Sequence, residues 1–281
     1  MCTRLQALHP VPRDTSAHVP TEDALVSQYP SGRSSVAAGA IDCLKTEPSL
    51  VVHALRHAAN DPGRLAVLDG TSNERFTRGE LAARSALLAA GLSERGIGRG
   101  DLVAVAMPNS VWWPVVALGV WRAGAALAPV SPRWTALETG RVLDYVRPSI
   151  AVAFGESVSV VRGALSAARL PIGVLVHDVA PETTPCTTLA RLLASADGDP
   201  LADPELQPSD LAAVLLSKVT GGPPKVVRLT HGELAAAAAA SANALGILGS
   251  LCAALHAGAP LVTAPTSVTE RVLEAPAAGP A

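Results

Sequence analysis

Short apolar runs alternate with helix-start signals in the middle of this 281-residue sequence, and this alternation constrains the fold more than any other feature. Thr77 and Thr135 are each followed by a glutamate three residues later, which is the capping-box pattern that begins an α-helix. Strands are predicted at the apolar runs between the helices, at residues 102–107, 125–130 and 150–154. Strands that alternate with helices predict an α/β fold, with mostly parallel sheets flanked by helices.

The stretch at residues 217–231, SKVTGGPPKVVRLTH, carries the most informative chemical pattern. It begins directly after a predicted strand at 211–216 and contains a second one at 226–229. Between the two strands, Thr220, paired glycines, paired prolines and Lys225 predict an irregular turn whose backbone amides can face an anion. Such a loop is typical of phosphate binding. It is not a Walker A loop, which has a longer glycine spacing and a helix directly after the lysine.

This stretch resembles the phosphate-binding loop of the adenylate-forming ligases, which include acyl- and aryl-CoA ligases, luciferases and the adenylation domains of peptide synthetases. The family pattern is Ser-Ser-Gly-Thr-Thr-Gly-x-Pro-Lys-Gly-Val, usually followed by Leu-Thr-His. The chain keeps nine positions of this pattern: Ser217, Thr220, Gly222, Pro224, Lys225, Val227, Leu229, Thr230 and His231. It departs at four: Lys218, Val219, Gly221 and Val226.

Three earlier segments are similar to the same family. Residues 76–81 are similar to its Thr-Tyr-x-Glu-Leu segment, residues 96–110 to its Gly-Asp-x-Val-Ala and Pro-Asn-Ser segment, and residues 117–125 to its Arg-Ala-Gly-Ala helix end. Order, spacing and element type agree together from about residue 48 to 265. On these segments the sequence is identified as a member of the family, as part of a truncated large N-terminal domain.

The resemblance implies a reaction and its cofactors. In the family, a carboxylate attacks the α-phosphate of ATP to give an acyl-adenylate and pyrophosphate, and the acyl group then usually passes to a thiol such as coenzyme A. The expected cofactors are therefore ATP and Mg²⁺, with coenzyme A as an acceptor and a small-molecule carboxylic acid as substrate. The expected nucleotide-binding residues are Ser217, Thr220, Gly221, Gly222 and Lys225.

The family's later motifs have no counterpart in this sequence. The Tyr-Gly-x-Thr-Glu segment, the ribose-binding Thr-Gly-Asp and the lysine of the small C-terminal domain are lacking, so no catalytic or metal-binding residue is assigned. We therefore expect a chain without activity on its own, and weak ATP binding because of the altered loop. Two alternatives stay open: a non-catalytic binding or regulatory module, and a ligase half that a separate C-terminal chain completes.

Composition narrows the class of protein. Hydrophobic residues make up 49% of the chain and charged residues 16%, which favours a globular domain with a sizeable core. The net charge of -2 gives no reason to expect nucleic acid or an anionic membrane as partner. The four cysteines show no metal-ligand spacing, and the start has no signal-peptide core, so a cytoplasmic protein is expected.

The domain boundaries follow from loss of periodicity. Residues 1–47 and 266–281 are rich in proline and small or polar residues and are predicted to be disordered tails, which leaves residues 48–265 as the partial AMP-binding domain. Within it, the helix that begins at 231 is expected either to extend into a helix at 248–257 or to stack directly on it, because a strand and turn found in the family are missing between them.

Other patterns have plainer explanations. His53 and His57 lie one helical turn apart but lack a third ligand, which favours a half-exposed helix face over a zinc site. The glycines at 96–100 precede a strand, whereas a dinucleotide-binding loop follows one. The uncharged run at 234–255 contains polar residues and is alanine-rich, which argues against a membrane helix. The tryptophans, at 112, 113, 121 and 134, are predicted to serve the core.

Overall fold

A computed structural model of the protein describes residues 50–70, 72–177, 188–195, 205–216, 226–240 and 247–263. The predicted tails at 1–47 and 266–281 lie outside the described residues, and so does the predicted loop at 217–225.

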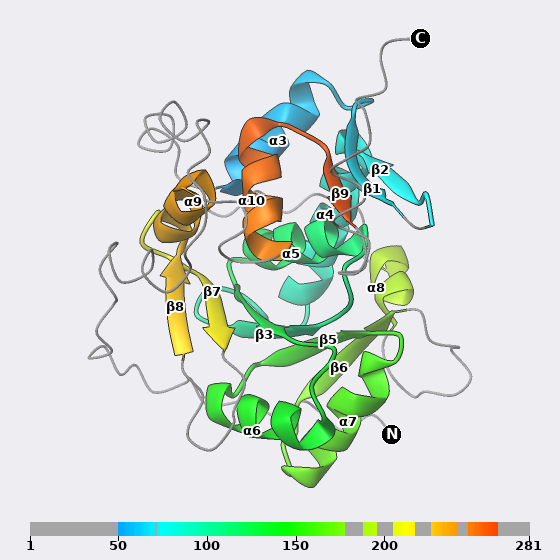
Figure 1. The fold of residues 1–281 in the computed structure, drawn as a ribbon, viewed down its shortest axis with the longest axis vertical. Helices are drawn as coiled ribbons and strands as arrows, with labels where there is room; N and C mark the ends of the chain where they lie inside the picture. The colour runs from blue at the N-terminus through cyan, green and yellow to red at the C-terminus, as the bar shows by residue number, and fades with distance from the viewer. Residues whose placement is uncertain are drawn as a thin grey trace.

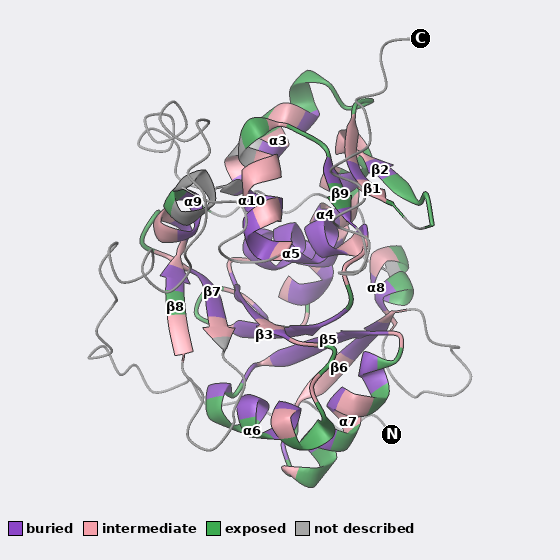
Figure 2. Ribbon diagram, in the orientation of Figure 1, coloured by how far each residue is buried: buried purple, intermediate pink, exposed green. Residues whose placement is uncertain are grey.

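The larger of two sheets has six strands in the order β6-β5-β3-β4-β7-β8. All neighbouring strands pair in parallel except β7 and β8, which pair antiparallel. Every residue of β3 and β5 is buried, as expected for strands that are covered by helices on both faces (Figures 1 and 2). The strands are β3 (Leu102–Ala106), β4 (Ala126–Val130), β5 (Ile150–Phe154), β6 (Gly173–His177), β7 (Leu211–Leu216) and β8 (Val226–Thr230). The predicted α/β fold with a mostly parallel sheet is confirmed.

Helices cover this sheet on both faces (Figure 1). Because successive strand residues point to opposite faces, Val103 and Val105 enter one core, with α4 and α5, while Ala104 and Ala106 enter a second core, with α7. The helices of the two faces are α4 (Arg78–Ser93) and α5 (Trp112–Arg122), then α6 (Ala136–Val146) and α7 (Ser157–Ala167). A short helix, α8 (Leu189–Ser195), packs against α4.

The smaller sheet has three strands in the order β2-β1-β9. Its central strand pairs antiparallel with β2 and parallel with β9, so the chain returns to its first strand at its last described element. The strands are β1 (Leu65–Asp69), β2 (Arg75–Thr77) and β9 (Leu261–Thr263), and the helices near them are α3 (Leu50–Asn60) and α10 (Ile247–Ala257).

Helix α9 (His231–Ala240) follows β8 and packs against α10. This contact agrees with the predicted stacking of the two helices, while residues 241–246 lie outside the described part of the chain. No helix among the described residues is long and apolar enough to cross a membrane.

The capping boxes form as predicted. Thr77 accepts a hydrogen bond from the Glu80 N–H at 3.2 Å and donates its own N–H to the Glu80 carboxylate at 2.8 Å. This hydrogen bond from the Thr77 backbone lowers the pKa of Glu80. Thr135 begins α6 in the same way, and at the start of α9 Thr230 and Glu233 form a further capping box.

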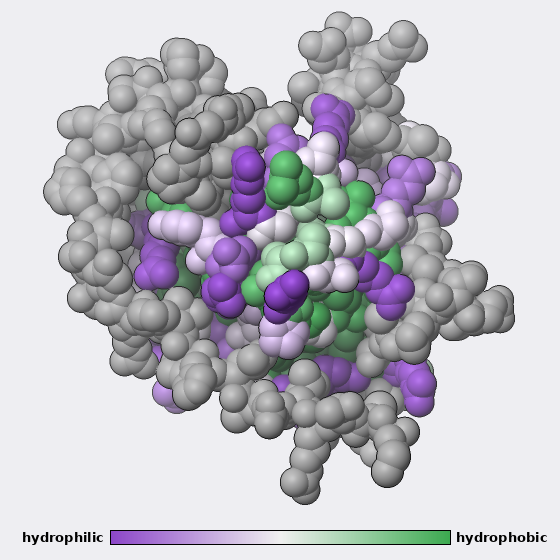
Figure 3. Space-filling model, turned by 90° about the horizontal axis from the view of Figure 1, so that it is seen from below, coloured by the Kyte–Doolittle hydropathy of each residue, from purple (hydrophilic) through white to green (hydrophobic). Residues whose placement is uncertain are grey.

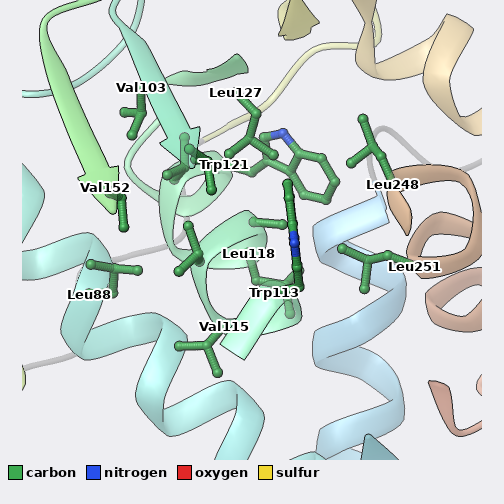
Figure 4. Close-up of a cluster of buried hydrophobic side chains, with 14 of the residues drawn as sticks. Leu88, Val103, Trp113, Val115, Leu118, Trp121, Leu127, Val152, Leu248 and Leu251 are labelled. Carbon is green, nitrogen blue, oxygen red and sulfur yellow. The ribbon is translucent and has the colours of Figure 1, made fainter. Parts of the chain in front are cut away.

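Two of the four tryptophans lie in the core, as predicted. Trp113 is 3% exposed and Trp121 is fully buried, and both lie on α5 among leucines of neighbouring elements (Figure 4). The Trp121 indole donates to the Ala212 carbonyl at 2.9 Å, so its one polar group is satisfied within the core. Trp112 and Trp134 are half-buried and pack at the edges of the two cores.

The surface on the side of α6 and α7 mixes hydrophobic and hydrophilic residues. Figure 3 views it from below, the side of α6 and α7, where hydrophobic residues lie among hydrophilic ones. Leu137 and Tyr145 of α6 are the most exposed large hydrophobic side chains among the described residues, at 66% and 57%. Single exposed hydrophobic residues of this kind are ordinary on a protein surface.

Candidate functional site

The strands that bound the predicted phosphate loop form a hairpin. β7 ends at Leu216 and β8 begins at Val226, and these two residues are paired across the ladder. The loop at 217–225 therefore connects two antiparallel strands at the carboxyl end of β7. The five predicted site residues belong to this loop and lie outside the described residues: Ser217, Thr220, Gly221, Gly222 and Lys225.

The large sheet has a switch point in its strand order. The chain runs from β3 to β4 on one side and then crosses back to β5 on the other side of β3. Ligands of open α/β sheets bind at such a switch point, outside the carboxyl ends of the strands. The switch point lies between β3 and β5, and β4 separates β3 from β7, so the hairpin leaves the same sheet two strands away from β3.

The register brings a second segment to the same edge. Leu127 of β4 is opposite Ala213 of β7, so the two strands end level with each other, at Val130 and Leu216. The segment after β4 carries the hydroxyl of Ser131 and the charge of Arg133. The N–H of Arg133 donates to the Ser131 hydroxyl at 3.3 Å, and Arg133 is exposed. No sequence pattern singled out this segment as part of a site. Its position depends on the order of the strands, which sequence patterns do not determine.

The base of the hairpin is fixed to the rest of the domain. The backbone N–H of His231 donates to the Asp210 carbonyl at 2.9 Å. The Asp210 carboxylate forms an ion pair with Arg99 at 3.2 Å and accepts the Gln207 N–H at 2.8 Å. Burial lowers the pKa of His231 to about 4, and the charge of Asp210 opposes this shift.

Aromatic side chains fill the space at the carboxyl ends of β5 and β6. Phe154 and His177 stack with their ring centroids 4.5 Å apart, and Trp112 lies 4.5 Å from the same histidine. Phe76 packs edge to face on Trp112, and the Arg84 guanidinium lies 4.4 Å over the Phe76 ring. This cluster joins the small sheet to the large one and contributes packing.

A small cavity lies on the other side of the helical layer. Its volume is about 30 Å³, which is room for a water molecule or a methyl group, and apolar residues of α3, α4, α5 and α10 line most of it. Arg78 borders it and donates to the carbonyls of His57, at 3.4 Å, and Gly258. A positive charge there stabilises the carboxyl ends of α3 and α10, so we assign Arg78 a structural role.

The two histidines that lie one helical turn apart, His53 and His57, belong to α3. The ring of His57 lies against Gly258, where an added Cβ would come within 2.6 Å of it. The side chain of His53 lies outside the described residues. In the part of the chain that the structure describes, no three His, Cys, Asp or Glu side chains are grouped as a metal site would require.

Comparison with known proteins identifies the family. The family model described as "AMP-binding enzyme" matches residues 55–273, which is most of the chain. The chain belongs to the AMP-binding enzyme family. This confirms the predicted membership of the adenylate-forming ligases, and the match falls on the N-terminal portion of the family.

Two curated relatives are CoA ligases. A propanoyl:CoA ligase of Rhodococcus jostii, whose acyl group carries a methyl-dioxo-octahydroindenyl ring, is 32% identical over 198 residues, covering 66% of this chain and 38% of the relative. The 4-coumarate–CoA ligase 3 of Oryza sativa is 33% identical over 171 residues, covering 61% of this chain and 30% of the relative. The chain thus spans about a third of the length of these relatives.

Solved structures share the fold. The luciferase-like enzyme of the mealworm Zophobas morio superposes with a TM-score of 0.69 at 20% identity, over 81% of this chain and 57% of that one. The apo structure of MbtA from Mycobacterium smegmatis has a TM-score of 0.68 at 23% identity, over 89% of this chain and 50% of that one. The protein therefore has the fold of the N-terminal domain of the adenylate-forming ligases, and it spans about half the length of these two structures.

Proposed function

We propose that this chain is the N-terminal, phosphate-binding portion of an AMP-forming acid–thiol ligase and that it has no ligase activity on its own. The observation that carries the proposal is the antiparallel pairing of β7 and β8, the two strands that flank residues 217–225 in the sequence. Membership of the family and the CoA ligase relatives support it.

The residues of the loop fit a phosphate group. Residues 217–225 contain two hydroxyls, two glycines and two lysines, and no carboxylate that would repel an anion. In this proposal, Ser217 and Thr220 donate hydrogen bonds to phosphate oxygens, the amides of Gly221 and Gly222 face the same oxygens, and Lys225 supplies a positive charge. Mg²⁺ would be held chiefly by the phosphates of ATP and by water, as is usual for this ion.

Catalysis needs more than this site. Adenylation depends on positioning the carboxylate and stabilising the charge that develops on the α-phosphate. The sequence segments that supply most of this stabilisation in the family have no counterpart here. The substrate, a small-molecule carboxylic acid, and coenzyme A as acceptor are accordingly proposed for the ligase reaction, and not for this chain alone.

Pyrophosphate exchange tests the proposal. The purified chain is expected to give no acid-dependent exchange of labelled pyrophosphate into ATP with a panel of aryl and fatty acids. Exchange above a no-enzyme control would contradict the proposed lack of activity. A full-length CoA ligase assayed in parallel establishes that the panel and the conditions support exchange.

A second candidate function is a ligase half that another polypeptide completes. The observation that favours it is coverage, because the chain spans only 30–38% of the two relatives. The same assay separates the two functions when it is run on protein isolated from its own cells as well as on recombinant protein. Exchange in the native preparation alone would favour completion by a partner, and a non-catalytic binding module would show no exchange in either.

A further inference from the structure

A buried histidine lies at the base of the β7–β8 hairpin. His231 is the first residue of α9 and directly follows β8, and it is 1% exposed. Neither of its ring nitrogens has a hydrogen-bond partner among the described residues. Burying a neutral imidazole without partners already costs free energy, because its nitrogens lose their hydrogen bonds to water and gain none from the protein.

The His231 ring contacts the group that anchors β7. Its neighbour is Trp121, with the ring centroids 5.7 Å apart in an edge-to-face arrangement. The same indole donates its N–H to the Ala212 carbonyl of β7 at 2.9 Å. The backbone N–H of His231 holds the Asp210 carbonyl, just before β7 begins. His231 therefore lies where β7, β8 and α9 join the core.

A proton on this ring would be unfavourable for two independent reasons. The ring is enclosed by the core, and it lies in the first turn of α9, where the helix dipole disfavours positive charge. The nearby acidic groups compensate only partly. Asp210 is already paired with Arg99, and Glu233 of the same helix turn is engaged with Thr230 in the capping box.

We propose that His231 is an acid-sensitive latch, whose protonation releases the β7–β8 hairpin and α9 from the core while the rest of the large sheet stays folded. The opening itself does not depend on nucleotide binding, so it can be tested separately from the proposed function.

The direction of the pH effect follows from the two states. When the hairpin is closed, burial lowers the pKa of His231 from its ordinary value of 6.5 to about 4. When the hairpin opens, the ring is exposed to water and its pKa returns to the ordinary value. The open state therefore binds a proton more readily. The closed state has its full stability above about pH 6.5 and loses it as the pH falls towards about 4, by up to tenfold in the opening constant per pH unit.

Hydrogen exchange of backbone amides measures this opening. Protection is compared for Leu234 and Ala235 of α9 and for Val103 and Val105 of β3, after correction for the intrinsic pH dependence of exchange. Between about pH 6.5 and about pH 5.5 we expect protection in α9 to fall about fivefold, and protection in β3 to change much less. An equal fall in β3 would mean global unfolding and would overturn the latch.

Three variants complete the test. His231→Phe and His231→Gln carry no titratable ring, so their α9 protection is expected to be independent of pH over the same window. His57→Gln removes a histidine elsewhere and should keep the wild-type profile. An acid-induced loss of α9 protection that persists in the two His231 variants would overturn the proposal. The comparison of α9 with β3 in the wild-type chain needs no variant, so it decides even if both substitutions prevent folding.

Discussion

Gly221 and Val219 are the two residues of the loop whose chemistry departs most from the family pattern. Gly221 offers no hydroxyl to a phosphate, and a hydrogen bond to a charged group contributes roughly 1.5–3 kcal/mol. If the position of Val219 requires a positive φ, as the family's glycine suggests, the β-branched side chain adds about 1–3 kcal/mol of strain. We therefore expect these departures together to weaken ATP binding by roughly a hundred- to ten-thousandfold.

Restoring the family residues should therefore tighten ATP binding. We expect the triple variant Lys218→Ser, Val219→Gly and Gly221→Thr to bind ATP more tightly than the unmodified chain, because it regains a hydroxyl and the conformational freedom of glycine. Lys218 attracts phosphate as a point charge but cannot replace the lost geometry. Titration calorimetry of both proteins measures the difference. Micromolar binding by the unmodified chain, or no gain in the triple variant, would show that the altered loop is not the cause of weak binding.

Residues differ in how far sequence alone can place them. The capping pair Thr77 and Glu80 was predictable because its hydrogen bonds depend on residues three positions apart. The environment of His231 was not, because Trp121 reaches it from another part of the chain. The same limit applies to Arg133, whose place beside the hairpin depends on which strand is the neighbour of β4.

At the scale of elements, the packing of α4 against α5 depends on a glycine. Gly119 of α5 faces Leu88 of α4, and a Cβ added to it would lie 2.7 Å from the Leu88 Cγ and 2.9 Å from its Cβ. Leu88 is fully buried, so its side chain has little room to move.

Gly119→Ala is accordingly expected to destabilise the protein by about 1–3 kcal/mol, even though alanine favours a helix over glycine by roughly 1 kcal/mol. Gly163→Ala in α7 is the matched control, because it is exposed and its added Cβ would meet only the Ala136 Cβ, at 3.9 Å. The control should gain up to about 1 kcal/mol. Urea unfolding of the two variants compares these effects, and a Gly119→Ala variant as stable as the control would contradict this account of the helix contact.

Whether a segment forms a helix or a strand was easier to predict than which elements lie next to it in the fold. Strands predicted at 102–107, 150–154 and 211–216 correspond to β3, β5 and β7, because buried parallel strands are short continuous apolar runs. Their order across the sheet was not predicted, since every apolar run of this kind can pair with any other. The loop at 217–225 could be identified as a candidate site from its own residues, whereas the edge that surrounds it could not.

At the scale of the whole molecule, the smaller sheet joins the two ends of the described chain. The Thr263 hydroxyl donates to the Leu68 carbonyl at 3.4 Å across 195 residues of sequence, and the Thr263 carbonyl accepts the Gly70 N–H at 2.8 Å. Leu261 and Thr263 are both buried, with exposed fractions of 6% and 1%. Such a distant pairing cannot be derived from local patterns, and it makes the last described strand a structural part of the domain.

Two truncations test this closure. A chain of residues 48–265 retains β9 and lacks only segments with the composition of disordered tails, so its free energy of unfolding should equal that of the full chain within about 0.5 kcal/mol. A chain of residues 48–259 also loses β9, and with it the burial of Leu261, which contributes about 1.5–3 kcal/mol, and the ladder to β1. We therefore expect the shorter chain to be less stable by at least about 2 kcal/mol in urea unfolding. Equal stability of the two truncated chains would mean that β9 does not stabilise the domain, and a large loss in the longer one would mean that the predicted tails do.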